Sequence, residues 1–176
     1  MVMLETLKKQ IADGTYTMTN KTLTNPVINY TDTTIGTNVK CRAYLGTAQN
    51  NIAANTNVTI TLQTENYDVG SDFNTGTYRF VAPVNGYYAV SACVGFSTIA
   101  DQKTYQAILN YNGTDGAYSM VSSSGTGPIR LQISDITYLT AGQYIELQGR
   151  TNDTSGAVDF IAASASTYMA VHLLSI

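Results

Sequence analysis

From residue 41 to residue 176, the chain alternates apolar and polar residues with a period of two. This period places every second side chain on the same face of a β-strand. Runs rich in Gly, Asn, Asp and Ser separate the alternating segments, and such runs form turns. The segments with the clearest alternation are 58–62, 88–96, 105–109, 129–134 and 144–150. About eight short strands at this spacing predict an all-β sandwich or jelly roll.

The last expected strand, 168–176, breaks the alternation because both of its faces are apolar. Met169, Val171 and Leu173 share one face. The other face carries Tyr168, Ala170, His172, Leu174 and Ile176. A strand that is apolar on both faces is covered on both faces. We therefore predict that one face packs in the core and the other forms an interface between subunits; a central position within a single subunit is the alternative.

Residues 3–12 predict a short helix ahead of the strands. Leu4, Leu7 and Ile11 recur at spacings of three and four, which places them on one helix face, and Gly14 ends the pattern. So short a helix is marginal in isolation. We therefore expect this attachment helix to dock on a partner or to pack with other copies of itself; a frayed terminus is the alternative.

Residues 15–40 are rich in Thr and Asn and hold few apolar side chains. Pro26 favours an extended backbone at the residue before it. Because such a segment has too few apolar residues for a core of its own, it predicts an extended arm. The chain therefore divides into an attachment helix and arm over 1–40 and a folded domain over 41–176.

Composition narrows the classes of partner. Charged residues make up 12% of the chain, well below the roughly 25% of ordinary soluble domains. The net charge is −3 and the nine Lys and Arg residues are scattered, whereas nucleic-acid binding requires a basic stripe. No apolar run approaches the roughly 18 residues that a membrane span needs. The first residues are too polar for a signal peptide, so we expect synthesis in a cytosol, no membrane span and no nucleic-acid partner.

The chain has two cysteines, Cys41 and Cys93, and each lies within a strand-like run. Two cysteines define no disulfide framework. We predict two buried thiols that pack as small apolar residues; a disulfide is the alternative.

Four segments follow one another in an order that is typical of a known family. They are Cys41–Gly46, the signature residues Phe80, Pro83, Gly86 and Tyr88, then Leu139–Leu147, and finally Ser166–Leu174. In order and spacing they resemble the head domain of the C1q and tumour-necrosis-factor-like superfamily, over about three-quarters of the chain. Gln143 stands where this family usually has an acidic residue. The resemblance implies a ten-strand jelly roll and a compact homotrimer.

The signature residues have physical reasons for their positions. Pro83 ends strand pairing because it has no N–H to donate. Gly86 permits a backbone turn that a Cβ would hinder. We therefore expect Tyr88 to enter the next strand with its side chain facing inward.

The predicted arm carries a second resemblance. Thr19–Ile28 (TNKTLTNPVI) resembles short connector phrases of bacteriophage tail-fibre and other virion appendage proteins. Together, the two resemblances imply a structural virion protein of a bacteriophage. Its homotrimeric knob would be attached through residues 1–40 to capsid or tail, as a head decoration or fibre protein or as a tail-fibre component. The alternatives are a host-receptor or glycan-binding adhesin module and a bacterial surface or spore-coat head domain.

Catalytic chemistry has few candidates in this chain. His172 is the only histidine, and no motif pairs the carboxylates. We therefore expect no enzyme activity and no cofactor. Asp68, Asp72 and Asp115 lie in Gly- and Asn-rich segments that can ligate calcium, but they lack the ordered spacing of a calcium loop.

Tyrosine is abundant, with 13 residues. Tyr67, Tyr111 and Tyr118, like Tyr87 and Tyr144, fall outside the clearest inward registers or in expected loops. Exposed tyrosines stack on sugars or anchor protein interfaces. We predict the first three as ligand contacts; packing between subunits is the alternative for each.

Overall fold

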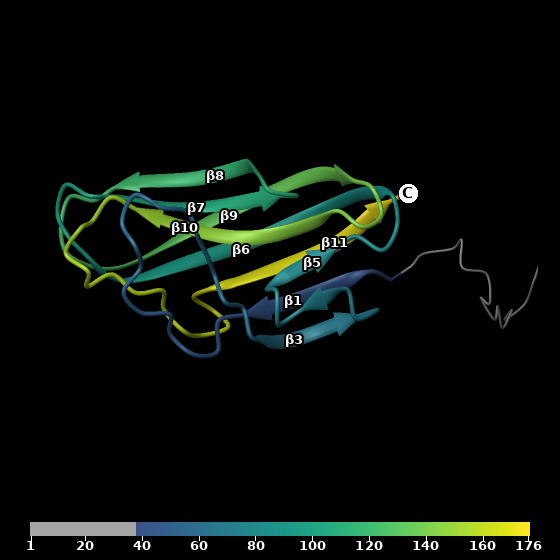
Figure 1. Ribbon diagram of the computed structural model, residues 1–176, viewed down its shortest axis with the longest axis horizontal. Helices are drawn as coiled ribbons and strands as arrows, with labels where there is room; N and C mark the ends of the chain where they lie inside the picture. Colours follow the sequence, from purple (N-terminus) through teal and green to yellow (C-terminus); the bar gives the residue numbers. More distant parts are fainter. Residues whose placement is uncertain (1–37) are drawn as a thin grey trace, which may run out of the picture. The chain divides into compact units, whose positions relative to one another are not determined.

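The computed structural model describes residues 38–176. They form eleven β-strands, arranged as two antiparallel sheets that pack face to face (Figure 1). No helix occurs within this range, and the architecture confirms the predicted all-β fold class. The predicted attachment helix at 3–12 and all but the end of the predicted arm lie outside the described residues.

The first sheet has the strand order β3-β1-β11-β6-β9. Its strands are β1 (Lys40–Tyr44), β3 (Thr64–Val69), β6 (Gly86–Ile99), β9 (Gly127–Leu139) and β11 (Tyr168–Ser175). Consecutive neighbours come from distant parts of the chain, so this sheet is held together by long-range pairing.

The second sheet has the order β4-β5-β10-β7-β8, and the short β2 pairs with β10 beside it. Its strands are β2 (Val58–Thr59), β4 (Phe73–Asn74), β5 (Arg79–Val81), β7 (Thr104–Tyr111), β8 (Thr114–Ser122) and β10 (Tyr144–Thr151). The total is eleven strands where the resemblance implied ten, and β2 and β4 are only two residues long.

A tight turn joins β7 to β8. Asn112 and Gly113 both have positive φ, 52° and 89°, which is the conformation that a type I′ turn requires and that Asn-Gly adopts readily. The Gly113 N–H donates to Asn110 Oδ1 at 2.9 Å. The turn thereby sets the register of β8 on β7, and with it the order of side chains on the outward side of the second sheet.

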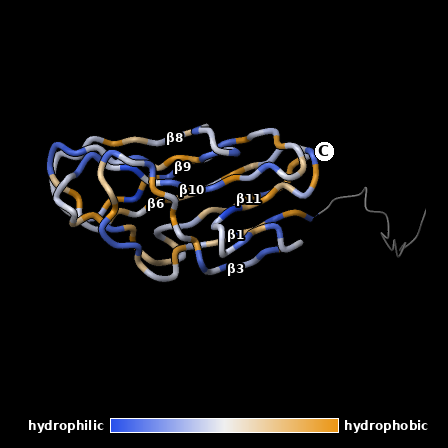
Figure 2. Tube along the Cα trace, in the orientation of Figure 1, coloured by the Kyte–Doolittle hydropathy of each residue, from blue (hydrophilic) through white to orange (hydrophobic). Residues whose placement is uncertain are grey.

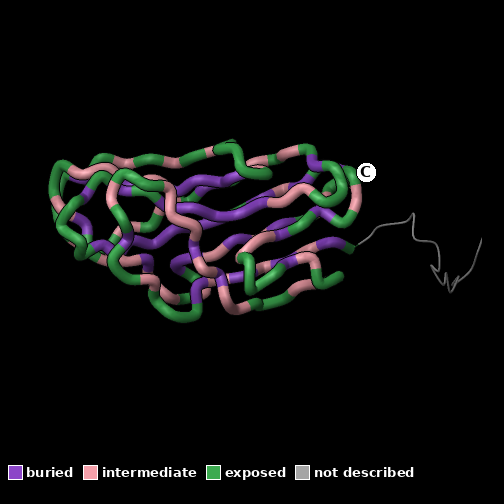
Figure 3. The backbone as a smooth tube through the Cα atoms, in the orientation of Figure 1, coloured by how far each residue is buried: buried purple, intermediate pink, exposed green. Residues whose placement is uncertain are grey.

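The core lies between the two sheets. Tyr88 and Phe96 of the first sheet meet Phe80 and Tyr105 of the second, with ring centroids 5.5 and 5.2 Å apart, and all four side chains are fully buried. Tyr88 also donates its hydroxyl to Val84 O at 2.7 Å, so it faces inward as predicted. Hydrophobic and hydrophilic residues alternate along the strands (Figure 2), and buried stretches follow the middle strands while the connecting loops are exposed (Figure 3).

Cys41 and Cys93 are both free and buried, which confirms the predicted pair of packed thiols. Burial is the main cause that raises the pKa of each thiol, so neither is activated as a nucleophile. Residues 38–176 contain no helix with the length and apolarity needed to cross a membrane.

Candidate functional site

The outward side of the first sheet carries most of the large apolar side chains that stay exposed in residues 38–176. One row across its five strands consists of Val69, Lys40, His172, Ala89 and Ile136. Directly paired residues of antiparallel strands point to the same side of a sheet. This side, which we call the apolar face, exposes Tyr67, Val69, Tyr87, Ile136, Tyr138 and Leu174, each between 36% and 63%.

Small residues form a shallow hollow at the middle of the apolar face. It measures about 410 Å³, and the lining includes Ala89, Ser91, Ser134 and Ala170 from the adjacent strands β6, β9 and β11. Tyr87 and Tyr138, which are paired in register, stack edge to face at 5.2 Å on the same side. The apolar face therefore has both projecting aromatic rings and a recess. Such a surface can pack closely against a complementary one in a protein interface.

Polar groups on the apolar face are largely paired with one another. The Tyr67 hydroxyl and His172 Nε2 form a hydrogen bond at 3.1 Å. The Arg42 guanidinium lies over the Tyr168 ring at 4.1 Å and donates to Asn66 Oδ1. Because these groups already have partners, covering them costs less than covering unpaired polar groups would.

The predicted interface residues of β11 all lie on the apolar face or beyond its end. Tyr168 and Ala170 are half-buried, His172 and Leu174 are exposed, and Ile176 is 71% exposed. The opposite face of β11 enters the core, where Met169 and Val171 are fully buried. Although β11 lies centrally in its sheet, His172, Leu174 and Ile176 stay exposed at its outward side and beyond its end. The subunit interface therefore remains a prediction.

The sequence did not predict that four further residues belong to the apolar face: Val69, Tyr87, Ile136 and Tyr138. One signal was present for two of them. In the segment 129–134 the positions opposite the core are Arg130, Gln132 and Ser134, and the same positions continue as Ile136 and Tyr138. A polar face that turns apolar toward the end of a strand indicates a surface that meets another protein.

The three predicted ligand tyrosines do not come together. Tyr67 lies on the apolar face, whereas Tyr118 is on β8 of the second sheet and is 66% exposed. Tyr111 is half-buried and donates its hydroxyl to Asp135 at 2.9 Å, which links the two sheets. Burial, followed by this carboxylate, raises the pKa of Tyr111. Tyr118 is therefore the most exposed of the three tyrosines.

Of the three aspartates of the calcium hypothesis, Asp68 and Asp72 are neighbours, and Asp115 lies apart from them. Asp68 accepts the backbone N–H groups of Asp72 and Phe73 at 3.1 and 2.9 Å and so caps a turn. Burial, with a contribution from Asp68, raises the pKa of Asp72. Asp115 lies on the other sheet. In the part of the chain that the structure describes, no group of three or more His, Cys, Asp or Glu side chains is placed to hold a metal ion.

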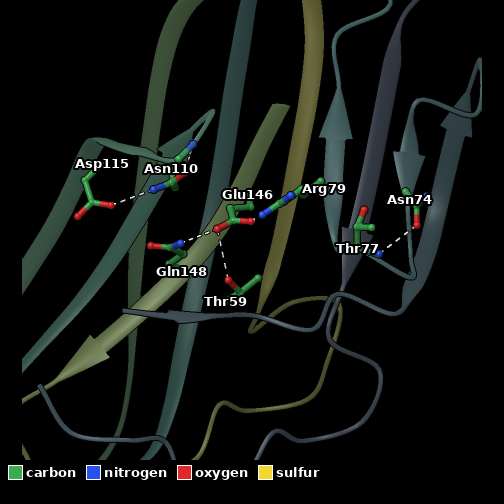
Figure 4. Close-up of polar contacts among 9 residues, drawn as sticks. Thr59, Asn74, Thr77, Arg79, Asn110, Asp115, Glu146 and Gln148 are labelled. Atoms are coloured by element: carbon green, nitrogen blue, oxygen red, sulfur yellow. Dashed lines mark hydrogen bonds and ion pairs between the residues drawn. The ribbon is translucent and has the colours of Figure 1, made fainter. Parts of the chain in front are cut away.

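A polar cluster joins three strands on the outward side of the second sheet (Figure 4). Glu146 is only 4% exposed and accepts from Arg79 Nε at 2.7 Å, from Gln148 Nε2 at 2.5 Å and from Thr59 Oγ1 at 3.3 Å. Glu146 raises the pKa of Arg79, whose guanidinium also covers the Tyr144 ring at 3.9 Å. A buried carboxylate with this many partners ties β2 and β5 to β10 and has a structural role.

Comparisons with known proteins identify the fold. No protein-family model and no curated protein matches the chain. Among solved structures, Eiger TNF from S. frugiperda is similar with a TM-score of 0.60 at 12% identity, covering 78% of this chain and 92% of that one. The globular domain of zebrafish complement 1qA has a TM-score of 0.57 at 12% identity, covering 78% and 97%. Murine APRIL has a TM-score of 0.61 at 11% identity, covering 77% and 98%. These likenesses confirm the predicted C1q/TNF-like jelly roll.

Proposed function

We propose that this chain forms a homotrimeric head domain by packing its apolar faces together, and that residues 1–40 attach the head to a bacteriophage particle. The observation that carries the proposal is the gathering of exposed large apolar side chains on one side of the first sheet. The C1q/TNF-like fold supports an assembly of three chains, because the family resemblance implies a homotrimer.

The energetics favour covering the apolar face. Soluble monomers rarely expose contiguous apolar patches larger than a few hundred Å², and burial of apolar area contributes about 25 cal/mol per Å² before the costs of association. The face is also rich in tyrosine, which anchors protein interfaces. A surface with few charged residues has few flexible side chains to order on association.

The virion role rests on the arm. Thr19–Ile28 resembles connector phrases of phage appendage proteins, and the Thr- and Asn-rich composition suits an extended segment held on a particle surface. The protein would be made in the host cytoplasm and carried on the virion, on capsid or tail. Recovery of the chain from cell envelopes or spore coats would instead support the alternative of a bacterial surface head domain.

Sedimentation of the full chain tests the assembly. We expect the mass of three chains at micromolar concentrations. Ile136→Lys should raise the concentration at which the trimer dissociates by about a hundredfold or more, because it would bury an unpaired charge. Val81→Lys is the matched control, since Val81 is 38% exposed on β5 of the second sheet. A wild-type chain that sediments as a monomer would refute the assembly.

Location on a particle tests the virion role separately. We expect an affinity-tagged chain produced in infected cells to be incorporated into purified phage particles. A chain lacking residues 1–37, which keeps Val39 in the core and β1 complete, should be left out. Particles without the tagged full chain would contradict the virion role, while leaving the trimer untouched.

A further inference from the structure

A groove runs along the outward side of the second sheet, away from the apolar face. Two adjoining hollows of about 260 and 330 Å³ share Gln106, Met120 and Arg150 in their walls. The first hollow extends to Tyr118, Asp115 and Asn57, and the second to Asn55 and Asn152. The walls therefore come from β7, β8, β10 and the segment before β2.

The strand register explains how these residues meet. Met120 pairs with Gln106, and Gln106 pairs with Arg150, which gives one row across three strands. In the next row Tyr118 pairs with Ile108. Ile108 is 2% exposed and forms the floor of the first hollow, whereas Tyr118 and Met120 are 66% and 54% exposed. The groove thus has an apolar floor and a projecting aromatic ring.

One end of the groove is held in place by hydrogen bonds. Asp115 accepts the side-chain amides of Asn57 at 2.8 Å and of Asn110 at 3.0 Å. Asn110 is 4% exposed and is itself fixed by the β7–β8 turn; Figure 4 shows Asn110 beside Asp115. A carboxylate has about four acceptor sites, so Asp115 is oriented and still able to accept from a ligand.

Arg150 supplies donors in the middle of the groove. It is exposed, and within residues 38–176 it forms no ion pair; the one ion pair there joins Arg79 to Glu146. The groove therefore combines an exposed cation that has no ion-pair partner among residues 38–176, an oriented carboxylate, several side-chain amides and an exposed tyrosine ring. We propose that it binds a hydroxyl-rich oligosaccharide.

The chemistry of the walls favours a saccharide over other ligands. Sugar hydroxyls both donate and accept, which suits Asp115 as acceptor and Arg150 as charged donor. The apolar face of a sugar ring packs on an aromatic side chain such as Tyr118. A nucleic acid would require a basic stripe, whereas this groove has a single arginine beside an aspartate. In the proposed trimer the apolar faces meet, so the three grooves stay outward and bind a repeating polymer with avidity.

A saccharide array tests the proposal with the full chain as probe. One set of spots carries neutral hexose oligosaccharides and the other carries oligosaccharides with carboxylates. The strongest binder of either set is then titrated by calorimetry against wild type, Tyr118→Ala, Tyr118→Phe, Arg150→Gln and Arg150→Lys. We expect Tyr118→Ala to weaken binding about tenfold and Tyr118→Phe to retain it, because the ring is retained. Arg150→Gln should weaken binding by a similar factor, and Arg150→Lys by less.

The outcomes separate the possible ligands. If Arg150→Gln affects only carboxylate-bearing sugars, Arg150 recognises the acid; if it affects both sets, Arg150 binds hydroxyls, and either result supports the groove. The proposal is overturned if no spot binds, or if Tyr118→Ala and Arg150→Gln both bind the saccharide like wild type. Ile136→Lys is the independent control: it should dissociate the trimer yet keep single-site affinity, so failure of the trimer and failure of the groove are distinguishable.

Discussion

Asp153 illustrates how one buried side chain joins separate segments of this domain. Asp153 is 3% exposed, and its carboxylate accepts the Ser155 N–H at 2.9 Å and the Tyr105 hydroxyl at 3.2 Å. Tyr105 Oη in turn accepts the Ala100 N–H at 2.9 Å. The Ser155 N–H is the main cause that lowers the pKa of Asp153, because hydrogen bonds to a carboxylate favour its charged form.

This lowered pKa predicts a pH dependence of stability. The folded state holds fewer protons on Asp153 than the unfolded state does, so the stabilisation is present above the ordinary pKa of 3.8 and is lost as pH falls through the folded value. Asp153→Asn should lower the free energy of unfolding by about 1.5 kcal/mol at pH 7. It should also flatten the fall in stability between neutral and acidic pH in urea titrations.

A matched control is available in Asp101, which is exposed in the turn before β7. Asp101→Asn should leave both the stability at pH 7 and its fall in acid close to wild type. Equal behaviour of the two variants would show that Asp153 is not a source of the acid sensitivity.

At the scale of elements, the pairing of β6 with β11 depends on Gly86. A Cβ on Gly86 would lie 2.5 Å from the Ser175 carbonyl oxygen and 2.7 Å from Leu173 Cδ1. The sequence pattern predicts that this glycine permits a turn that a Cβ would hinder. The structure assigns the requirement to close approach instead, because Gly86 is already the first residue of β6 and is not among the glycines with positive φ.

Gly86→Ala should therefore push the end of β11 away from β6 and destabilise the fold by about 1–3 kcal/mol, the usual cost of overpacking. Chemical unfolding measures the loss. Gly125→Ala is the control, because a Cβ there meets nothing within 4 Å, and it should leave stability within about 0.5 kcal/mol of wild type. If the two alanine variants were equally stable, close approach at Gly86 would not be limiting.

The sequence pattern predicted some strands well and missed others for a physical reason. β6, β7 and β10 lie inside their sheets, so their inward faces must be apolar and the period of two is visible. β3 and β8 are mostly exposed, and neither is among the segments whose alternation predicted a strand. Strands of this kind form through backbone pairing with a neighbour, and backbone pairing leaves no hydrophobic pattern to detect.

The segment 58–62 shows the converse error. Its alternation predicted a full strand, yet β2 covers only Val58–Thr59. Ile60 and Leu62 are nevertheless fully buried, and the Ile60 N–H donates to Leu147 O at 2.9 Å. Alternating burial therefore does not by itself require continuous strand pairing.

At the scale of the whole molecule, the sequence predicts the residues of a candidate surface only where those residues belong to a single strand. The residues of β11 on the apolar face follow from the pattern of a single strand. Val69, Tyr87 and Ile136 join them through the strand order of the first sheet, which the periodicity does not reveal. The groove likewise needs β8, β7 and β10 to be neighbours, so Tyr118 was identified as a candidate but Arg150 was not.

A chain without residues 1–37 keeps the whole described domain, and this predicts how a shortened chain should behave. Both sheets and the core between them are formed by residues 38–176, and the apolar face is built from the same residues. A chain lacking residues 1–37 should therefore unfold within about 3 °C of the full chain and sediment as a trimer, while losing attachment to the particle. Calorimetry and sedimentation at matched concentrations measure the first two effects.

The alternative arrangement gives the opposite result. If the predicted helix at 3–12 packs with its copies through Leu4, Leu7 and Ile11, deleting residues 1–37 should convert the trimer to a folded monomer. Leu7→Asp in the full chain separates the cases without any truncation, because a charge in a helix seam weakens only an assembly that uses the seam. Two results together would show that the apolar face stabilises the trimer: Leu7→Asp forms a trimer as stable as wild type, and Ile136→Lys dissociates. Residues 1–37 would then serve attachment and not assembly.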